Sequence, residues 1–377
     1  MITRRDFLSA AILAPALGRL QPVFGGRLIG TVPFGNRDVP TTPLNRLLGA
    51  GLDARLFTDL STITSERLIT PTDRFFVRTA SPPALPDSAA WKIDCAGLVD
   101  RPAAIDLASL GKIATRSGRY LIECAGNADP DNYGLISVAD WEGVPIASLL
   151  ERVGVRSTAT RVLVSGFDIE NTPQQTSRTS VPGASWVFSR DDLRQALLAT
   201  RMNGTPLTGE HGSPVRLIVP GWYGCACIKW VNRIELVDDA APATTQMMEF
   251  AQRTHQASRS ERASDYLPAT IDTAAVPIRV ERWEVAGKIE YRVIGIIWGG
   301  QTPTNALAIR FKTSDPWTPV DNCPMPATTL TWSLWTHAWR PTEPGRYEIV
   351  LKITDPAIRT RRLDLFYYVR TVTIDAL

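Results

Sequence analysis

The sequence predicts an α+β protein, in which a domain of mixed helices and strands is followed by a β-sandwich. Strands mix with short helices from residue 55 to residue 240, whereas residues 269–377 carry several short strands with turn signals between them. Residues 241–268 are polar and rich in Ala, Thr, Ser and Arg, so we expect a linker or an excursion between domains there. The chain has 377 residues, of which 44% are hydrophobic and 21% charged, and it can form two cores.

Strands and helices are both expected in the first domain. Residues 91–99 alternate between apolar and polar side chains, which predicts a half-buried strand. Residues 191–199 have apolar side chains at helical spacing and follow Ser189, a residue type that caps helices, so they predict a short amphipathic helix. The other elements expected here are strands at 75–78, 161–165 and 215–219 and a helix at 146–153.

The second domain is expected to be all β. A Pro344-Gly345 turn precedes one of its strands, as is common in sandwiches. The tryptophans between residues 332 and 339 are, on their own, more typical of a core than of an interface. The expected strands are 291–298, 306–312, 329–335, 346–353 and 366–374.

The N-terminus has the features of an export signal. Thr3–Leu8 is a twin-arginine pattern, and the mildly apolar stretch that follows, Ser9–Leu17, is too short to span a bilayer. We therefore expect residues 1–26 to be a twin-arginine signal region, cleaved between about Ala16 and Gly26. The alternative is an ordinary amphipathic N-terminal helix. Twin-arginine export carries folded proteins, often with a cofactor, to the periplasm or otherwise out of the cytoplasm.

Composition argues against two classes of partner. The net charge of +3 is nearly neutral for this length and argues neither for nor against nucleic acid. No cluster of Lys and Arg with interleaved aromatic residues is present, so nucleic acid is not expected. Beyond the signal region, no apolar run approaches the length that a membrane-spanning helix needs, so no membrane span is expected.

The number and spacing of cysteines and histidines limit the kinds of metal site that the chain can form. Five cysteines leave at least one free thiol, and the absence of any Cys-x-x-Cys pair argues against zinc ribbons and ferredoxin-like clusters. Three separated histidines argue against a multi-histidine metal site. The apolar stretch Tyr120–Ile122 leads Cys124 into the turn-forming residues Ala125–Asn127, where a ligand can reach the thiol. A buried core cysteine is the alternative.

Five ordered blocks give the chain a resemblance to a known family. Cys124 lies in the second block, Glu-Cys-Ala-Gly-Asn, and the fourth block is long and specific. From about Pro71 to the end, the chain resembles the sulfite oxidase family of molybdenum enzymes. The C-terminal part resembles the dimerisation domain of that family, which implies an immunoglobulin-like β-sandwich. The blocks are residues 75–79, 123–127, 164–168, 202–221 and 224–230.

The resemblance implies a molybdenum–molybdopterin cofactor with Cys124 as catalytic residue and metal ligand. Thiolate is the protein ligand suited to a soft, sulfur-rich metal centre. Arg216 is placed to pair with the phosphate of the pterin. Taken singly, Arg78 and Lys229 are more typical of surface strands, and His211 and Asp168 of turns; the ordered set favours cofactor binding. The residues implied to bind the cofactor are Phe75, Phe76, Val77, Arg78, Thr79, Cys124, Asp168, His211, Arg216, Cys227, Ile228 and Lys229.

The sequence departs from the family around the expected substrate pocket. Where sulfite-oxidising members commonly carry arginines, directly after Cys-Ala-Gly-Asn, this chain has Ala128 and Asp129. Thr200-Arg201 replaces a tyrosine before the fourth block, and Thr79-Ala80 replaces an Asn-His pair. These differences weaken sulfite as the substrate and leave the cofactor assignment unchanged.

An anionic substrate still requires positive charge in its pocket. Arg370, near the C-terminus, resembles a substrate-pocket arginine of the family and is assigned a catalytic role. Arg178 and Arg201 are further candidates.

The function expected from the resemblance is that of an exported molybdopterin-dependent oxidoreductase. It would transfer an oxygen atom between a small oxyanion or oxide and an oxo-molybdenum centre. No counterpart of the b-type haem domain of some members is present, so electrons would pass to a separate carrier such as a periplasmic cytochrome c. A homodimer is the assembly that the C-terminal domain implies. The alternatives are a sulfoxide or other oxide reductase, and a non-catalytic binding protein on the same scaffold.

Overall fold

The computed structural model describes residues 26–35, 43–50, 53–79, 85–129, 132–167, 184–256 and 258–375. The predicted signal region, apart from Gly26, lies outside these ranges, and so do Asp168 and Arg178. No helix within the described ranges is long and apolar enough to cross a membrane.

The first half of the chain contains two five-stranded sheets. One runs in the order β10 (Ser185–Ser189), β9 (Arg161–Gly166), β14 (Val231–Val237), β5 (Lys92–Gly97) and β6 (Ala103–Asp106). The other runs in the order β12 (Thr205–Pro206), β11 (Leu197–Met202), β8 (Ile136–Pro145) and β7 (Arg116–Glu123), with β13 (Arg216–Ile218) also paired to β11. All pairings are antiparallel except β5 with β14.

The β7–β8 hairpin places the predicted ligand. Its register joins Glu123 to Ile136, so residues 124–135 form the loop between the two strands. The last three residues of β7 are buried, whereas its first residues are partly exposed. Cys124 therefore emerges from the buried end of a strand, as the sequence predicted.

The second half contains two four-stranded sheets. Trp339 on the first sheet stacks on Phe311 with ring centroids 4.4 Å apart and meets Tyr347 of the second sheet at 4.9 Å. This packing of two sheets agrees with the predicted sandwich, and its immunoglobulin-like character stays a prediction. The first sheet orders β1 (Arg27–Val32), β15 (Ala274–Val285), β16 (Lys288–Trp298) and β19 (Ser333–Trp339); the second orders β18 (Thr318–Pro319), β17 (Leu307–Arg310), β20 (Gly345–Ile353) and β21 (Arg370–Ile374).

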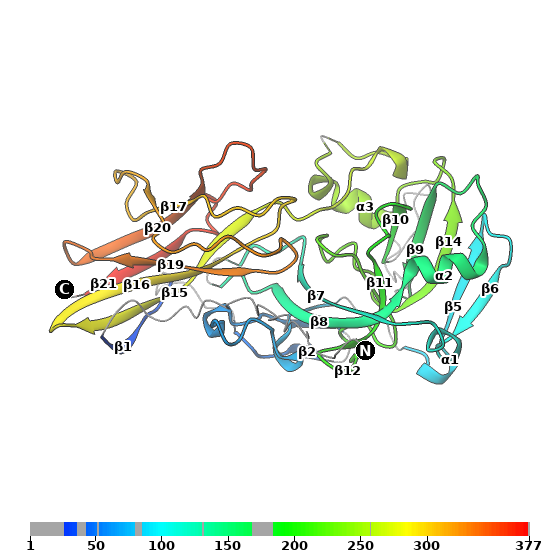
Figure 1. Cartoon of the computed structure of the whole chain (residues 1–377), viewed down its shortest axis with the longest axis horizontal. Helices are drawn as coiled ribbons and strands as arrows, with labels where there is room; N and C mark the ends of the chain where they lie inside the picture. The colour runs from blue at the N-terminus through cyan, green and yellow to red at the C-terminus, as the bar shows by residue number, and fades with distance from the viewer. Residues whose placement is uncertain are drawn as a thin grey trace, which may run out of the picture.

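Figure 1 shows the C-terminal sheets at one end of the long axis and the sheet of β9 and β14 at the other, with β7 and β8 between them. One continuous apolar core extends through both halves. The small elements are a sheet of β2 (Leu48–Ala50), β3 (Asp53–Leu56) and β4 (Val77–Arg78), helices α1 (Leu107–Leu110), α2 (Ile146–Val153) and α3 (Thr245–Glu249), and 3-10 turns η1 (Leu60–Thr62), η2 (Thr72–Arg74), η3 (Ser88–Ala90), η4 (Ala251–Thr254) and η5 (Ala263–Asp265).

The helix expected at residues 191–199 is wrong. Ser189 and Asp192 do exchange hydrogen bonds, with the Ser189 N–H donating to Asp192 Oδ2 (2.9 Å) and the Asp192 N–H donating to Ser189 Oγ (3.2 Å). A turn follows instead of a helix, and β11 begins at Leu197. Because β11 pairs with β8 on one side and β13 on the other, its first residues are fully buried. A short apolar run of this kind is ambiguous between helix and strand.

Two segments for which the sequence predicted no strand or helix contain regular structure. Residues 27–32 form β1, which pairs antiparallel with β15. The segment 241–268, expected to be a linker or an excursion, carries α3 and packs on β10. There the Thr244 hydroxyl donates to the Ser185 carbonyl (2.7 Å), and Met247 is 1% exposed. This segment therefore belongs to the packed body of the first half.

Candidate functional site

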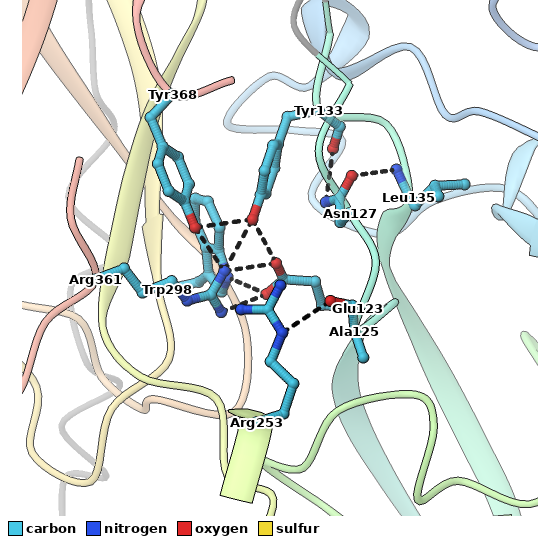
Figure 2. Close-up of polar contacts among 9 residues, drawn as sticks. All are labelled: Glu123, Ala125, Asn127, Tyr133, Leu135, Arg253, Trp298, Arg361 and Tyr368. Atoms are coloured by element: carbon cyan, nitrogen blue, oxygen red, sulfur yellow. Dashed lines mark hydrogen bonds and ion pairs between the residues drawn. The ribbon is translucent and has the colours of Figure 1, made fainter. Parts of the chain in front are cut away.

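The loop that carries Cys124 is closed by the side chain of Asn127. Its Nδ2 donates to the Tyr133 carbonyl (3.0 Å), and its Oδ1 accepts from the Leu135 N–H (3.2 Å), as Figure 2 shows. The Cys124 N–H donates to the Leu135 carbonyl (2.9 Å), and the Asn127 N–H donates to the Cys124 carbonyl (3.0 Å). Asn127 is 1% exposed, so these bonds form in a dry environment. The loop thus presents the thiol from a fixed backbone.

Cys124 is half-buried and lines a cavity of about 230 Å³. Burial raises the pKa of the thiol, while the Gly126 backbone N–H and the charges of Arg78 and Lys229 oppose that rise. The free side chain is therefore a thiol at neutral pH. Binding of a metal ion would remove its proton and supply the compensating charge.

Three cations face this cavity: Arg78, Arg216 and Lys229. The Lys229 ammonium donates to the carbonyls of Glu210 (2.7 Å) and Arg78 (3.3 Å). Glu249 is the one carboxylate among the described residues that line the cavity, and it is exposed. The charge at the cavity is therefore net positive, which suits an anionic ligand.

Arg216 is the buried cation of the three, at 3% exposed. Its Nη1 donates to the His211 carbonyl (3.3 Å), and its guanidinium lies 5.6 Å from the Trp141 ring centroid. Burial lowers the pKa of Arg216 to about 10, so it stays charged at neutral pH. Its Nε is buried without a hydrogen-bond partner among the described residues. A buried donor without a partner costs stability unless a ligand accepts from it.

These features fit a molybdopterin with a phosphate group. A planar guanidinium with an unused donor suits phosphate, which it can bind through two parallel hydrogen bonds. Nowhere in the described ranges do three or more His, Cys, Asp or Glu side chains gather to hold a metal ion. A metal at Cys124 would therefore need most of its ligands from an organic group, as a pterin dithiolene provides.

The structure brings eight of the predicted cofactor residues to this cavity. They come from four separate parts of the chain, and two of the cations are Arg216, next to the Gly-Ser-Pro turn, and Lys229. At Gly212, where φ is +104°, an added Cβ would lie 3.1 Å from the Lys229 Cβ and 3.2 Å from the Arg216 Cβ. The eight are Phe76, Arg78, Thr79, Cys124, Arg216, Cys227, Ile228 and Lys229.

Phe75, Val77 and His211 lie behind the cavity wall. Phe75 is fully buried and stacks on Phe76 with ring centroids 5.3 Å apart. Val77 packs in a separate small cluster with Ala54 and Leu56. These residues support the wall and do not line the cavity.

His211 is neutral and connects two parts of the wall. Its Nδ1 lies 2.8 Å from the Thr208 hydroxyl and its Nε2 lies 3.3 Å from the Phe75 carbonyl oxygen. Burial, followed by the positive charges of Lys229 and Arg216, lowers the pKa of His211 to about 4. The imidazole therefore adds no charge to the site at neutral pH.

Arg370, predicted as a substrate-pocket arginine, lies elsewhere. It sits in β21, is 1% exposed, and its Nη1 donates to the Tyr367 carbonyl (3.0 Å). Its guanidinium is 5.9 Å from the Phe34 ring centroid. The cavity around Cys124 is lined without it. Arg201, a further candidate, pairs with Glu142 at 3.9 Å and does not line the cavity either.

Several residues at the site had no signal in the sequence motifs. Gln246, Glu249 and Phe250 come from the segment expected to be a linker. Cys225 and Trp230 also line the cavity and lie in the fifth block, although they were not among the predicted cofactor residues. Asp129, which replaces a family arginine, has a local role in the loop. Its Oδ1 accepts from the Asn132 N–H (2.8 Å), and its carbonyl accepts from the Tyr133 N–H (3.1 Å).

Comparison with known families identifies the domain in which this site lies. Residues 80–245 match the model of the oxidoreductase molybdopterin binding domain. These residues are a molybdopterin-binding oxidoreductase domain of the sulfite oxidase and nitrate reductase family. The predicted family and the predicted molybdopterin cofactor are thereby confirmed. The match contains the loop of Cys124, the cavity cations Arg216 and Lys229, and Gly212.

Curated relatives share this molybdopterin-binding domain over part of their length. The NADH nitrate reductase of Cichorium intybus is 29% identical over 222 residues, which are 55% of this chain and 22% of that protein. The NADH nitrate reductase of Solanum lycopersicum is 30% identical over 224 residues, with the same two shares. The chain thus spans about a fifth of the length of these relatives.

A solved structure extends the comparison beyond the molybdopterin-binding domain. The crystal structure of the sulfane dehydrogenase SoxCD from Paracoccus pantotrophus superposes with a TM-score of 0.62 at 19% identity. The match covers 92% of this chain and 91% of that one. The two chains therefore share a fold over both halves.

Proposed function

We propose that the chain is an exported molybdopterin-dependent oxidoreductase that transfers an oxygen atom to or from a small oxyanion or oxide. The observation that carries the proposal is the Cys124 thiol, which a closed loop holds at a cavity lined by three cations. The bound cofactor would supply two-electron redox chemistry at molybdenum.

The residues of this chain have separate roles in that proposal. Cys124 would ligate the metal, and the Asn127-closed loop fixes where its sulfur lies. Arg216 would bind the phosphate of the cofactor through the donors that face the cavity, and Lys229 would add a second positive charge. The apolar part of the cavity wall includes Phe76, Ile228, Trp230 and Phe250.

A reductase acting on a sulfoxide or another neutral oxide is the second candidate. Its support is the charge beside the site, where the family's anion-binding arginines are replaced by exposed Ala128 and by Asp129, and where Glu249 lies at the cavity. A neutral substrate would not be repelled by these residues. A non-catalytic binding protein on the same scaffold is the remaining alternative, and its metal content would be low.

A substrate screen with molybdenum-loaded protein tests the function directly. Sulfite with a cytochrome c as acceptor tests the oxidase, and sulfoxides and nitrate with a reduced dye as donor test the reductase. Turnover in one arm and not the other assigns the direction. Loaded protein with one molybdenum per chain and no turnover in either arm would contradict the proposed activity.

Export, assembly and the electron carrier are part of the same proposal. The twin-arginine pattern at Arg4 and Arg5 supports a periplasmic location, and a separate carrier such as a cytochrome c would take the electrons. The C-terminal sheets are the proposed homodimer surface. Lysine at both arginines should keep the precursor in the cytoplasm, which mass spectrometry of cell fractions measures; unchanged export would contradict the signal.

A further inference from the structure

Glu123, the residue directly before Cys124, is a buried carboxylate whose two oxygens each accept two hydrogen bonds. Oε1 accepts from Arg361 Nη1 (2.6 Å) and from the Tyr133 hydroxyl (2.8 Å). Oε2 accepts from Arg361 Nη2 (2.7 Å) and from Trp298 Nε1 (2.9 Å), as Figure 2 shows. Glu123 is 1% exposed and the Arg361 side chain 7% exposed, so this is a buried, two-point ion pair.

Most of this network comes from the C-terminal half. Arg361 lies between β20 and β21, and its backbone N–H donates to the Thr273 carbonyl (3.1 Å). Trp298 ends β16, and Tyr368 precedes β21. The Tyr368 hydroxyl accepts from Arg361 Nη1 (2.9 Å) and lies 2.9 Å from the Tyr133 hydroxyl. Side chains of the C-terminal half therefore bind Glu123, the residue that directly precedes the proposed metal ligand.

A second arginine holds the other side of Cys124. Arg253 Nε donates to the Ala125 carbonyl (2.8 Å), and the Gly224 N–H donates to the Glu123 carbonyl (2.7 Å). Arg253 and Arg361 lie 5.1 Å and 5.2 Å from the centroid of the same ring, Tyr223. The residues on both sides of Cys124 are thus tied to fixed cationic groups.

Stability alone is a poor explanation of this arrangement. Removing two charges from water costs several kcal/mol per ion, and a buried ion pair is often no more stabilising than apolar residues of the same volume. Buried ion pairs do fix one geometry, because a carboxylate with four directed donors has one favourable position. That property is useful where a neighbouring atom must be placed accurately.

We propose that Arg361 is a positioning residue for Cys124, through which the C-terminal half fixes the direction of the thiolate toward the cofactor. This inference rests on the proposed ligand role of Cys124. It assigns the C-terminal half a part in the metal site in addition to any part in dimerisation. Arg361 acts through Glu123 and does not line the cavity itself.

The test compares Arg361→Lys, which keeps the charge and loses the two-point contact, with Glu123→Gln and a control, Arg279→Lys. Arg279 pairs with Glu281 (2.9 Å) within β15, where the two side chains are 16% and 11% exposed, and it lines no part of the cavity. Hydrogen exchange on cofactor-free protein should rise about tenfold at residues 124–127 in Arg361→Lys and stay unchanged in β20. Arg279→Lys should leave residues 124–127 unchanged.

The second measurement uses the same variants loaded with the molybdenum cofactor. Arg361→Lys should retain its molybdenum while the electron paramagnetic resonance spectrum of the metal shifts or broadens, and Arg279→Lys should match the wild type. The proposal would be overturned if residues 124–127 of Arg361→Lys exchanged at the wild-type rate, or if the exchange rate rose equally in β20. Should Arg361→Lys fail to fold, Glu123→Gln decides by the same readings. The exchange result does not depend on metal binding, so failure of this inference is distinguishable from failure of Cys124 as ligand.

Discussion

Asn127 Nδ2 donates to the Tyr133 carbonyl across the loop that carries Cys124, at 3.0 Å. Tyr133 adopts a positive φ of 62°, which residues other than glycine rarely do. The amide side chain thus holds a conformation that the backbone would not choose alone. The loop contains no regular secondary structure among its described residues, and the hydrogen bonds of the Asn127 side chain take the place of strand hydrogen bonds.

Replacing Asn127 with Ala should therefore destabilise the protein. The change leaves the Tyr133 carbonyl and the Leu135 N–H without their buried partner, at a cost of about 2 kcal/mol. Urea unfolding of cofactor-free protein measures it. Asn132→Ala is not a clean control because Asn132 also bonds to Thr58 and Leu60, so Asn305→Ala, at an exposed position of the second half, serves instead. A midpoint equal to the wild type in Asn127→Ala would refute the role of this side chain.

Replacing Arg216 with Lys should reduce cofactor loading. Lysine keeps one charge and loses the planar fork, so the affinity for a phosphate-bearing pterin should fall about tenfold. Fluorescence of the oxidised pterin released from purified protein measures the loading. Arg201→Lys, outside the cavity, is the matched control. Equal loading in Arg216→Lys and wild type would mean that the phosphate binds elsewhere.

The stability of cofactor-free protein should fall as the pH falls from about 6.5 towards 4, in part through His211. Burial lowers its pKa to about 4, whereas the unfolded chain takes up the proton near 6.5. Between these values the unfolded state binds more protons, so acid favours unfolding, by at most about 3 kcal/mol. His211→Asn should flatten this slope in urea unfolding across the range. An unchanged slope would show that His211 titrates normally.

Replacing Glu249 with Gln should favour anionic substrates. Removing the one carboxylate at the described cavity wall raises the potential there, so kcat/KM for an oxyanion should rise severalfold at low salt and less at high salt. Glu151→Gln, at an exposed position of α2, is the control. Steady-state kinetics at two ionic strengths measure the effect. A rise that persists unchanged at high salt would not be electrostatic.

The sequence predicted elements whose local pattern agrees with their final environment. The helix at 146–153 formed as expected, because four apolar residues on one face, such as Ile146 and Leu149, are buried together. The strand at 161–165 is β9, extended by one residue. At 191–199 the local signal and the tertiary environment disagree, since the apolar run Leu197–Ala199 is buried between two neighbouring strands.

Site residues could be predicted where they lie in a sequence motif, but not where they come from segments that are distant in the sequence. The prediction took residues 75–79 as a whole, yet Phe76, Arg78 and Thr79 line the cavity while Phe75 and Val77 do not. Arg361 and Glu123 are 238 positions apart in the sequence, and no local sequence pattern predicts their contact. The same holds for Glu249, which α3 brings to the cavity wall.

One measurement tests directly whether Cys124 provides the protein ligand to molybdenum. Cys225 lines the same cavity and is the natural rival. Molybdenum K-edge X-ray absorption on loaded wild type, Cys124→Ser and Cys225→Ser distinguishes the two thiols. If Cys124 is the ligand, Cys124→Ser loses a sulfur neighbour of the metal while Cys225→Ser keeps the wild-type spectrum. A Cys124→Ser spectrum identical to that of the wild type would contradict it.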